Sequence, residues 1–202
     1  HKRASTLSFD EMCQSITRTH DLIDNAYKKA GVARTGNFYR FAYLDRGMGP
    51  WFVEPEKISL GHKKTISTLI KKGLGNDPDI TPTPDQIAFK NKLQDFLSLS
   101  GYTPPPFKGI TLPFYKETEM ASAIDAMFTF STSDWAISAR HQGKFGFSDI
   151  NDLKVAIDKD KNLTRTDTTH IIMAHDQAEI HDVVINLVDH MLEQGISFKE
   201  IQ

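Results

Sequence analysis

The chain has 202 residues, of which 39% are hydrophobic and 25% are charged, a composition typical of a globular protein. The formal net charge of −2 argues against a general nucleic-acid-binding protein. Cys13 is the only cysteine, which excludes an internal disulfide and a metal site built from several thiolates, and no apolar run approaches the roughly 20 residues that a membrane-spanning helix needs.

The first half of the chain predicts helices separated by one strand. Ser8 and Glu11 fit a capping box at the start of a helix over residues 9–30, in which Cys13 falls on the apolar stripe as a small core residue. The aromatic-rich segment 37–43 predicts a short strand. A helix is expected over 63–72, and Thr83 with the proline after it predicts the start of another helix over 84–99.

The second half predicts an alternation of strands and helices. Strands are expected at 107–112, 126–131, 171–174 and 196–198, and helices at 117–125, 149–159 and 180–192. Short apolar runs alternating with amphipathic helices are typical of parallel βα units. The sequence therefore predicts a single α/β domain over residues 1–202.

Three of the expected strands end in residues with useful chemistry, namely Arg40, Asp134 and His175. The carboxyl ends of parallel strands lie on one face, so these residues would converge on one cleft. An aspartate beside a histidine fixes its tautomer and suits it to general acid catalysis, and an arginine can orient a carboxylate. Each residue also has a structural interpretation, with Arg40 as a surface ion pair, Asp134 as a helix N-cap and His175 as an ordinary strand-end residue.

Aromatic residues accompany these positions. Trp135 follows Asp134 directly and offers a flat apolar wall for the face of a sugar ring, although a place in the core explains it equally well. Three further histidines match no motif, and the two on the last helix are interpreted as solvent-facing or structural: His170, His181 and His190.

The order of these motifs resembles that of the polysaccharide deacetylase family, also called the NodB-homology family or carbohydrate esterase family 4. The matching pieces cover nearly the whole chain: His1 followed by Leu7-Ser8, Arg40-Phe41-Ala42-Tyr43, Asp134-Trp135, and Met173-Ala174-His175-Asp176.

The resemblance implies a distorted (β/α)7-type barrel and a metal-dependent hydrolase that removes acetyl groups from an N-acetylated carbohydrate such as chitin or peptidoglycan. It also implies a divalent metal, zinc foremost, and a periplasmic or secreted location. The roles it implies are His1 as a metal ligand, His175 as general acid, Asp134 as the residue that tunes His175, Arg40 as a residue that orients the base, Tyr43 near the oxyanion, and Trp135 with Leu44 as walls of the acetyl pocket.

The chain departs from the family pattern at its amino-terminal side. The first motif, which supplies the base and a metal-binding aspartate, is absent, and one ligand cannot hold a zinc ion. We therefore expect a barrel that is incomplete at its amino-terminal end, with the missing groups encoded before His1. The long interval between Arg40 and Asp134 is explained by an insertion over 48–82 or by divergent scaffold.

Two alternatives remain open from the sequence. One is a carbohydrate-binding domain without catalysis that uses Trp135 and Tyr43 as stacking surfaces. The other is a metal-independent α/β domain in which the His175-Asp176 pair is structural.

Overall fold

The chain forms two compact units in the computed structural model, which describes residues 2–74, 76–125 and 127–199. The first unit comprises His1–Pro106 and Lys116–Met127, and the second comprises Phe107–Tyr115 and Phe128–Ile201. The single helical turn α4 (Pro113–Lys116) lies where the chain passes from the second unit back to the first.

The first unit is helical. Its main helices are α1 (Phe9–Ala30), α2 (Leu60–Thr68), which continues as a π-helical turn over Leu69–Gly73, and α3 (Pro84–Leu99). Short 3-10 turns occupy Ala4–Thr6, Ala42–Leu44, Pro55–Lys57 and Glu119–Ala121.

Helix α1 begins and ends where the local chemistry requires. The Ser8 side chain accepts a hydrogen bond from the backbone of Glu11, and the Glu11 carboxylate accepts one from the backbone of Ser8, so the capping box is confirmed. Gly31 ends the helix with a φ of 66°, which glycine adopts without strain.

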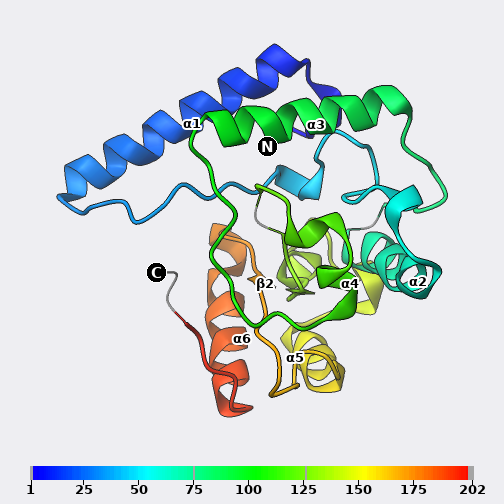
Figure 1. Cartoon of the computed structure of the whole chain (residues 1–202). Helices are drawn as coiled ribbons and strands as arrows, with labels where there is room; N and C mark the ends of the chain where they lie inside the picture. Colours follow the sequence, from blue (N-terminus) through cyan, green and yellow to red (C-terminus); the bar gives the residue numbers. More distant parts are fainter. Residues whose placement is uncertain (1, 75, 126, 200–202) are drawn as a thin grey trace. The chain divides into compact units, whose positions relative to one another are not determined.

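Helices α1 and α3 lie side by side and bury one apolar cluster between them (Figure 1). Met12 and Ile16 on α1 and Leu93 and Leu97 on α3 are all buried in that cluster. Removing these side chains from water drives the pairing of the two helices, at roughly 1.5–3 kcal/mol for each fully buried side chain.

A cluster of buried charges forms a second interior feature of this unit. The Lys90 ammonium contacts the carboxylates of Glu54 and Glu119, and the Arg46 guanidinium lies 3.1 Å from Asp125. Arg46 also donates to the backbone carbonyl of Phe52 at 2.7 Å, and Gln94 on α3 donates to Asp125 at 2.7 Å. These contacts hold segments that are distant in sequence against α3.

The second unit contains one small sheet and two packed helices. Strand β1 (Phe130–Ser131) pairs in parallel with β2 (Ile172–Met173), with Phe130 opposite Ile172 and Ser131 opposite Met173. Helices α5 (Ile150–Lys159) and α6 (His181–Glu193) pack together, and 3-10 turns occupy Asp134–Ile137, Lys144–Gly146 and Ala178–Ile180. The core between them consists of Leu153, Ile157, Leu163, Leu187 and Met191.

The prediction of an α/β barrel is wrong. The structure is about 51% helical, and the only strands among the described residues are the two short parallel strands of one sheet. The segments 37–41, 107–112 and 196–198 form no strand, and only part of the strand expected over 126–131 is present, with Ala126 outside the described residues.

The reason is that a strand needs a neighbouring backbone to pair with. In the expected strand over 37–43, the side chain of Tyr39 instead packs edge-on against Phe41 and Tyr102, and Tyr43 turns the chain with a φ of 59°. Four of the predicted helices are confirmed, since they match α1, α3, α5 and α6 closely. The helix expected over 63–72 starts earlier, at Leu60, and only a turn forms within 117–125.

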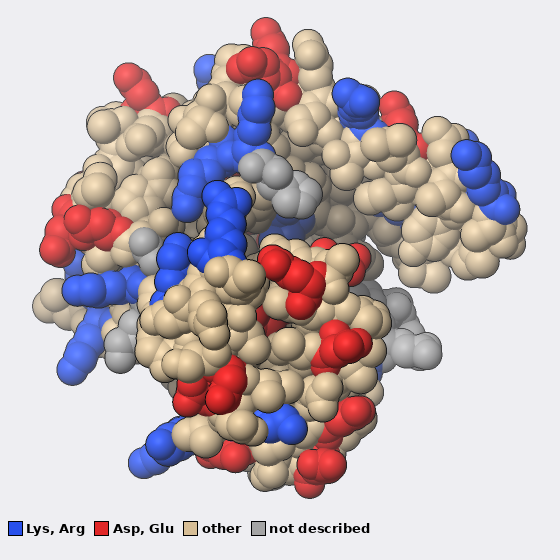
Figure 2. Space-filling view, turned by 180° about the vertical axis from the view of Figure 1, so that it is seen from behind, with Lys and Arg blue, Asp and Glu red and all other residues tan. Residues whose placement is uncertain are grey.

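The surface carries both signs of charge, and Figure 2 shows Lys and Arg as well as Asp and Glu side chains on the face it draws. Among the described residues, no helix is both long enough and apolar enough to cross a membrane.

Candidate functional site

The small sheet brings Asp134 and His175 together in the second unit. Strand β1 ends at Ser131, and Ser133, with a φ of 55°, turns the chain so that Asp134 begins a 3-10 turn. Strand β2 ends at Met173, two residues before His175. Because β1 and β2 run in parallel, the residues that follow them meet at one edge.

Asp134 accepts two hydrogen bonds from His175. Its Oδ2 accepts from the His175 backbone amide at 2.7 Å, and its Oδ1 lies 2.7 Å from the ring Nδ1. The Thr132 hydroxyl adds a bond of 2.9 Å to Oδ1. The carboxylate is fully buried, so these three donors take the place of water.

The hydrogen bonds keep Asp134 ionised. Burial is the largest single influence and acts to raise its pKa, but the bonds from His175 and Thr132 together with the charge of His175 outweigh it, so the pKa of Asp134 lies below the ordinary value of 3.8. An ionised carboxylate has no proton to donate, so the ring Nδ1 of His175 carries the hydrogen of their bond.

The remaining ring nitrogen of His175 is left for other chemistry. The side chain of His175 is 31% exposed, and its Nε2 has no partner among the described residues. Asp176 is exposed and makes no hydrogen bond with His175 in the described part of the chain. The carboxylate that orients the ring is therefore Asp134 and not the sequence neighbour.

Trp135 lies in an aromatic cluster next to this pair. The indole is half-buried and packs edge-to-face against His141 and Phe145, with ring centroids 5.1 and 5.5 Å away. The Lys144 ammonium lies 5.7 Å from the indole centroid. Three residues of the loop over 138–147 thus lie against the tryptophan.

Arg40 and Tyr43 belong to the first unit, so the convergence of all three predicted positions stays a prediction. Arg40 is half-buried, and burial lowers its pKa while the charge of Asp125 opposes that shift. Tyr43 is 54% exposed, and the guanidinium of Arg3 lies 4.7 Å from its ring centroid. Leu44 is buried.

The metal ion implied by the resemblance is not tested by the described residues. His1, the predicted ligand, lies outside them, and within residues 2–74, 76–125 and 127–199 no group of three or more histidine, cysteine or acidic residues could hold one. The divalent metal implied by the resemblance therefore stays an expectation.

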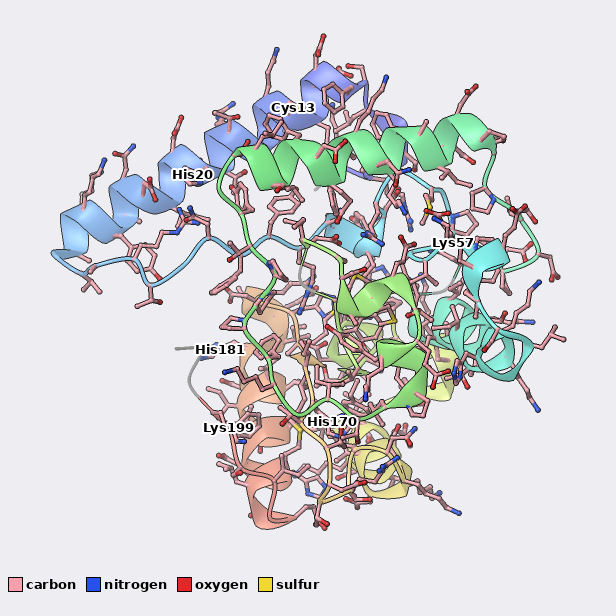
Figure 3. All side chains as sticks on the ribbon, viewed as in Figure 1. Cys13, His20, Lys57, His170, His181 and Lys199 are labelled. Carbon is pink, nitrogen blue, oxygen red and sulfur yellow. The ribbon has the colours of Figure 1, made fainter. Side chains whose placement is uncertain are left out.

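The other singled-out side chains have structural surroundings. His190 Nε2 lies 2.7 Å from Asp158 and links α6 to α5, and His170 lies between Thr129 and the backbone of Asn162. His181 is exposed, and Cys13 lies half-buried on α1, where burial raises the pKa of its thiol (Figure 3).

The sequence reasoning missed two groups at this site. Thr132 stands two residues before Asp134, and its hydroxyl could have been suspected from that spacing, because serine and threonine often bond to acceptors two residues away. The aromatic and cationic residues of the 138–147 loop carry no comparable signal. Comparison of the chain with protein-family models, with curated proteins and with solved structures gave no match.

Proposed function

We propose that this protein is a hydrolase that removes acetyl groups from an N-acetylated carbohydrate, with His175 as the general acid. The observation that carries the proposal is the double hydrogen bond from His175 to the buried carboxylate of Asp134. The motif order of the polysaccharide deacetylases supports the substrate class, since Arg40, Asp134-Trp135 and His175 follow one another as they do in that family.

The geometry suits proton donation. Asp134 holds the ring through Nδ1 and the backbone amide together, which fixes both the tautomer and the orientation of His175. In the hydrolysis, the oxygen of a water molecule bonds to the acetyl carbon, and Nε2 then delivers a proton to the leaving nitrogen as the bond between that nitrogen and the acetyl carbon breaks, which releases acetate and the free amine. A positioned acid of this kind typically contributes 10²–10⁴-fold to the rate.

Asp134 acts through His175 as a positioning residue. Its buried carboxylate accepts the hydrogen of Nδ1, so the proton to be donated is carried at Nε2. Trp135, one residue further along, would form a wall beside the reacting group; the Lys144 ammonium lies 5.7 Å from its ring centroid.

Acetate release tests the proposal. The full chain is assayed on chitin oligosaccharides and on peptidoglycan, in buffer with added zinc and with a chelator. We expect His175→Ala to reduce acetate release about 10²-fold or more with the fold intact by circular dichroism. His181→Ala is the matched control, because this exposed histidine lies six positions further along and outside the Asp134 pair.

The alternative is a carbohydrate-binding domain without catalysis. It would use the rings of Trp135 and Tyr43, each of which already has a cation near its face. If the wild type binds sugar but releases no acetate, the hydrolase proposal is wrong and the binding domain is the better explanation. Unchanged acetate release in His175→Ala would remove His175 from the mechanism.

A further inference from the structure

Helix α2 and the π-helical turn after it form a strongly basic segment of the first unit (Figure 1). Between Glu56 and Asp77 the sequence has five lysines and one histidine and no acidic residue, whereas the chain as a whole has a formal net charge of −2. A run of one sign of charge on a helix indicates either a solvated face or a surface for a partner of opposite charge. The contacts of these lysines bear on that choice.

The apolar face of α2 is already used in the first unit. Ile66 and Ile70 are fully buried, so the helix is held against the unit on that side. The outward face carries the exposed side chains of Lys63, Lys64 and Lys71. Lys64 and Lys71 are seven positions apart, a spacing that places them on one side of the helix.

These three lysines form no ion pair with the described part of the chain. The cationic residues of the segment that do so are Lys57 with Glu54 and His62 with Glu117, both at 2.8 Å. The start of α2 adds to the positive potential, because Ser59 makes no side-chain cap and the first turn has no acidic residue. The outward face thus carries positive charge that the described residues leave uncompensated.

Leu60, the first residue of α2, belongs to the same exposed face. It is 90% exposed, and it lies four positions before Lys64, so the two side chains are neighbours on the helix. Peripheral helices bind anionic bilayers through this combination of side chains: the lysines attract the lipid head groups, and the apolar side chain enters the boundary between head groups and acyl chains.

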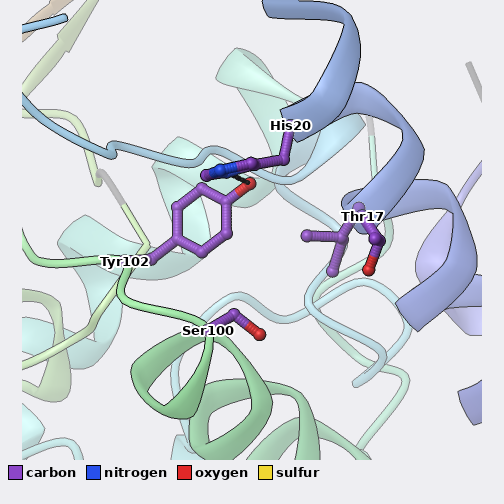
Figure 4. Close-up of a pocket in the computed structure, with 5 residues that line it drawn as sticks. Thr17, His20, Ser100 and Tyr102 are labelled. Carbon is purple, nitrogen blue, oxygen red and sulfur yellow. Dashed lines mark hydrogen bonds between the residues drawn. The ribbon is translucent and has the colours of Figure 1, made fainter. Parts of the chain in front are cut away.

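The small cavity of the first unit contains no residue of α2 (Figure 4). It has a volume of about 190 Å³ and lies between α1 and the chain that leaves α3 at Gly101. Ile16 and Tyr102, which line it, are 1% and 5% exposed, so it presents little accessible apolar surface. The exposed combination of charge and an apolar side chain is found on α2 instead.

A nucleic acid fits this face less well than a lipid surface. Between Glu56 and Asp77 there is no arginine, the residue that binds phosphate or a base edge with two parallel hydrogen bonds. The same segment has no phenylalanine, tyrosine or tryptophan on which an unpaired base could stack. An exposed leucine has no role in binding a phosphate backbone, whereas a bilayer gives it an apolar environment.

We propose that the outward face of α2 is a docking surface for an anionic lipid bilayer, with Lys63, Lys64 and Lys71 against the head groups and Leu60 in the boundary beneath them. Each lysine should favour an anionic over a neutral surface about fivefold, and the three together about 10²-fold. The screening length of about 8 Å at physiological salt keeps this attraction local, so the overall charge of −2 does not cancel it. No residue assigned to the proposed reaction takes part.

Co-sedimentation of the full chain with lipid vesicles tests the surface. We expect about 10²-fold stronger partitioning into phosphatidylcholine vesicles that contain about 30% phosphatidylserine than into phosphatidylcholine alone, and loss of this preference as the salt rises from about 0.1 M to about 0.5 M. Lys64→Gln and Lys71→Gln should each weaken the binding about fivefold. Leu60→Ser should weaken it at both salt concentrations, because insertion of an apolar side chain is not screened. Lys92→Gln, at an exposed lysine of α3, is the control and should bind like the wild type.

Four results would overturn the proposal: no binding to the anionic vesicles at low salt, equal binding to the neutral vesicles, unchanged binding in both α2 lysine variants, or tighter binding to a DNA duplex than to vesicles at the same phosphate concentration. The His175→Ala protein should bind vesicles like the wild type while it loses acetate release. Failure of either proposal therefore leaves the other standing.

Discussion

The carboxylate of Asp134 accepts hydrogen bonds from the backbone amide and from the ring Nδ1 of His175, both at 2.7 Å, although the two residues are 41 positions apart in the sequence. The pair joins the ends of the two parallel strands, so it is part of the structure of the second unit as well as a candidate for proton transfer. The protonation state of Asp134 therefore affects both the stability and any activity of this protein.

The free energy of unfolding should depend on pH through Asp134. Because its pKa is lowered in the folded chain, the unfolded chain takes up the proton first as the pH falls. The stabilisation is present above the ordinary pKa of 3.8 and is lost as the pH falls through the lower folded value. Urea unfolding between about pH 6 and pH 2.5 should show a steeper loss below pH 4 for the wild type than for Asp134→Asn. Parallel curves for the two proteins would show that the ionised Asp134 carboxylate does not stabilise the fold.

Lys90 should be among the most sensitive charged residues of the first unit. Its side chain is 2% exposed and pairs with both Glu54 and Glu119, so Lys90→Ala removes the cation that these two carboxylates share, and leaves each with one further cation, Lys57 at 2.8 Å from Glu54 and Arg46 at 3.6 Å from Glu119. We expect a loss of about 3 kcal/mol, the lower end of the range for broken buried pairs, because Glu119 keeps some access to water. Chemical denaturation measures it.

The matched control for this experiment is Lys92→Ala on the same helix. Lys92 is exposed, so its removal should change the free energy of unfolding by no more than about 0.5 kcal/mol. Equal effects of the two substitutions would mean that the buried cluster contributes no more than a surface lysine.

The start of α3 provides a test of local sequence chemistry. The Thr83 hydroxyl accepts the backbone N–H of Gln86, and the Gln86 side chain accepts the backbone N–H of Thr83. Thr83→Ala should cost about 1 kcal/mol of unfolding free energy, while Thr83→Ser keeps the hydroxyl and should be close to neutral. A neutral Thr83→Ala would show that α3 is held by packing alone.

Such local signals explain which parts of the fold could be predicted. In each capping box, Ser8 with Glu11 and Thr83 with Gln86, the two partners lie within four residues of each other along the chain. The periodicity of apolar residues in a helix is equally local, so α1 and α3 can be predicted from the sequence. The strands do not, because a segment such as 37–43 becomes a strand only if another segment pairs with it. Its aromatic side chains pack against Tyr102 instead.

The candidate site divides in the same way. The prediction that Asp134 and His175 follow two parallel strands is sufficient to bring the two residues together, because β1 and β2 pair in parallel. The buried ion pairs of Lys90 and Arg46 depend on partners 29 to 79 residues away, and no spacing in the sequence marks them. The cavity at Tyr102 also depends on a long-range contact, between α1 and the turn at Gly101.

Two glycines of the first unit should respond in opposite ways to alanine. Gly47 has a φ of 92°, and a Cβ there would lie 2.3 Å from the ring of Phe89, so Gly47→Ala is strained in its backbone and clashes with α3. Gly61 lies within α2 with open space around it, and there alanine should raise the free energy of unfolding by up to about 1 kcal/mol. Thermal unfolding of the two variants beside the wild type measures both shifts. A stabilised Gly47→Ala would show that the turn before α2 rearranges freely, and a destabilised Gly61→Ala would show that α2 does not form as described.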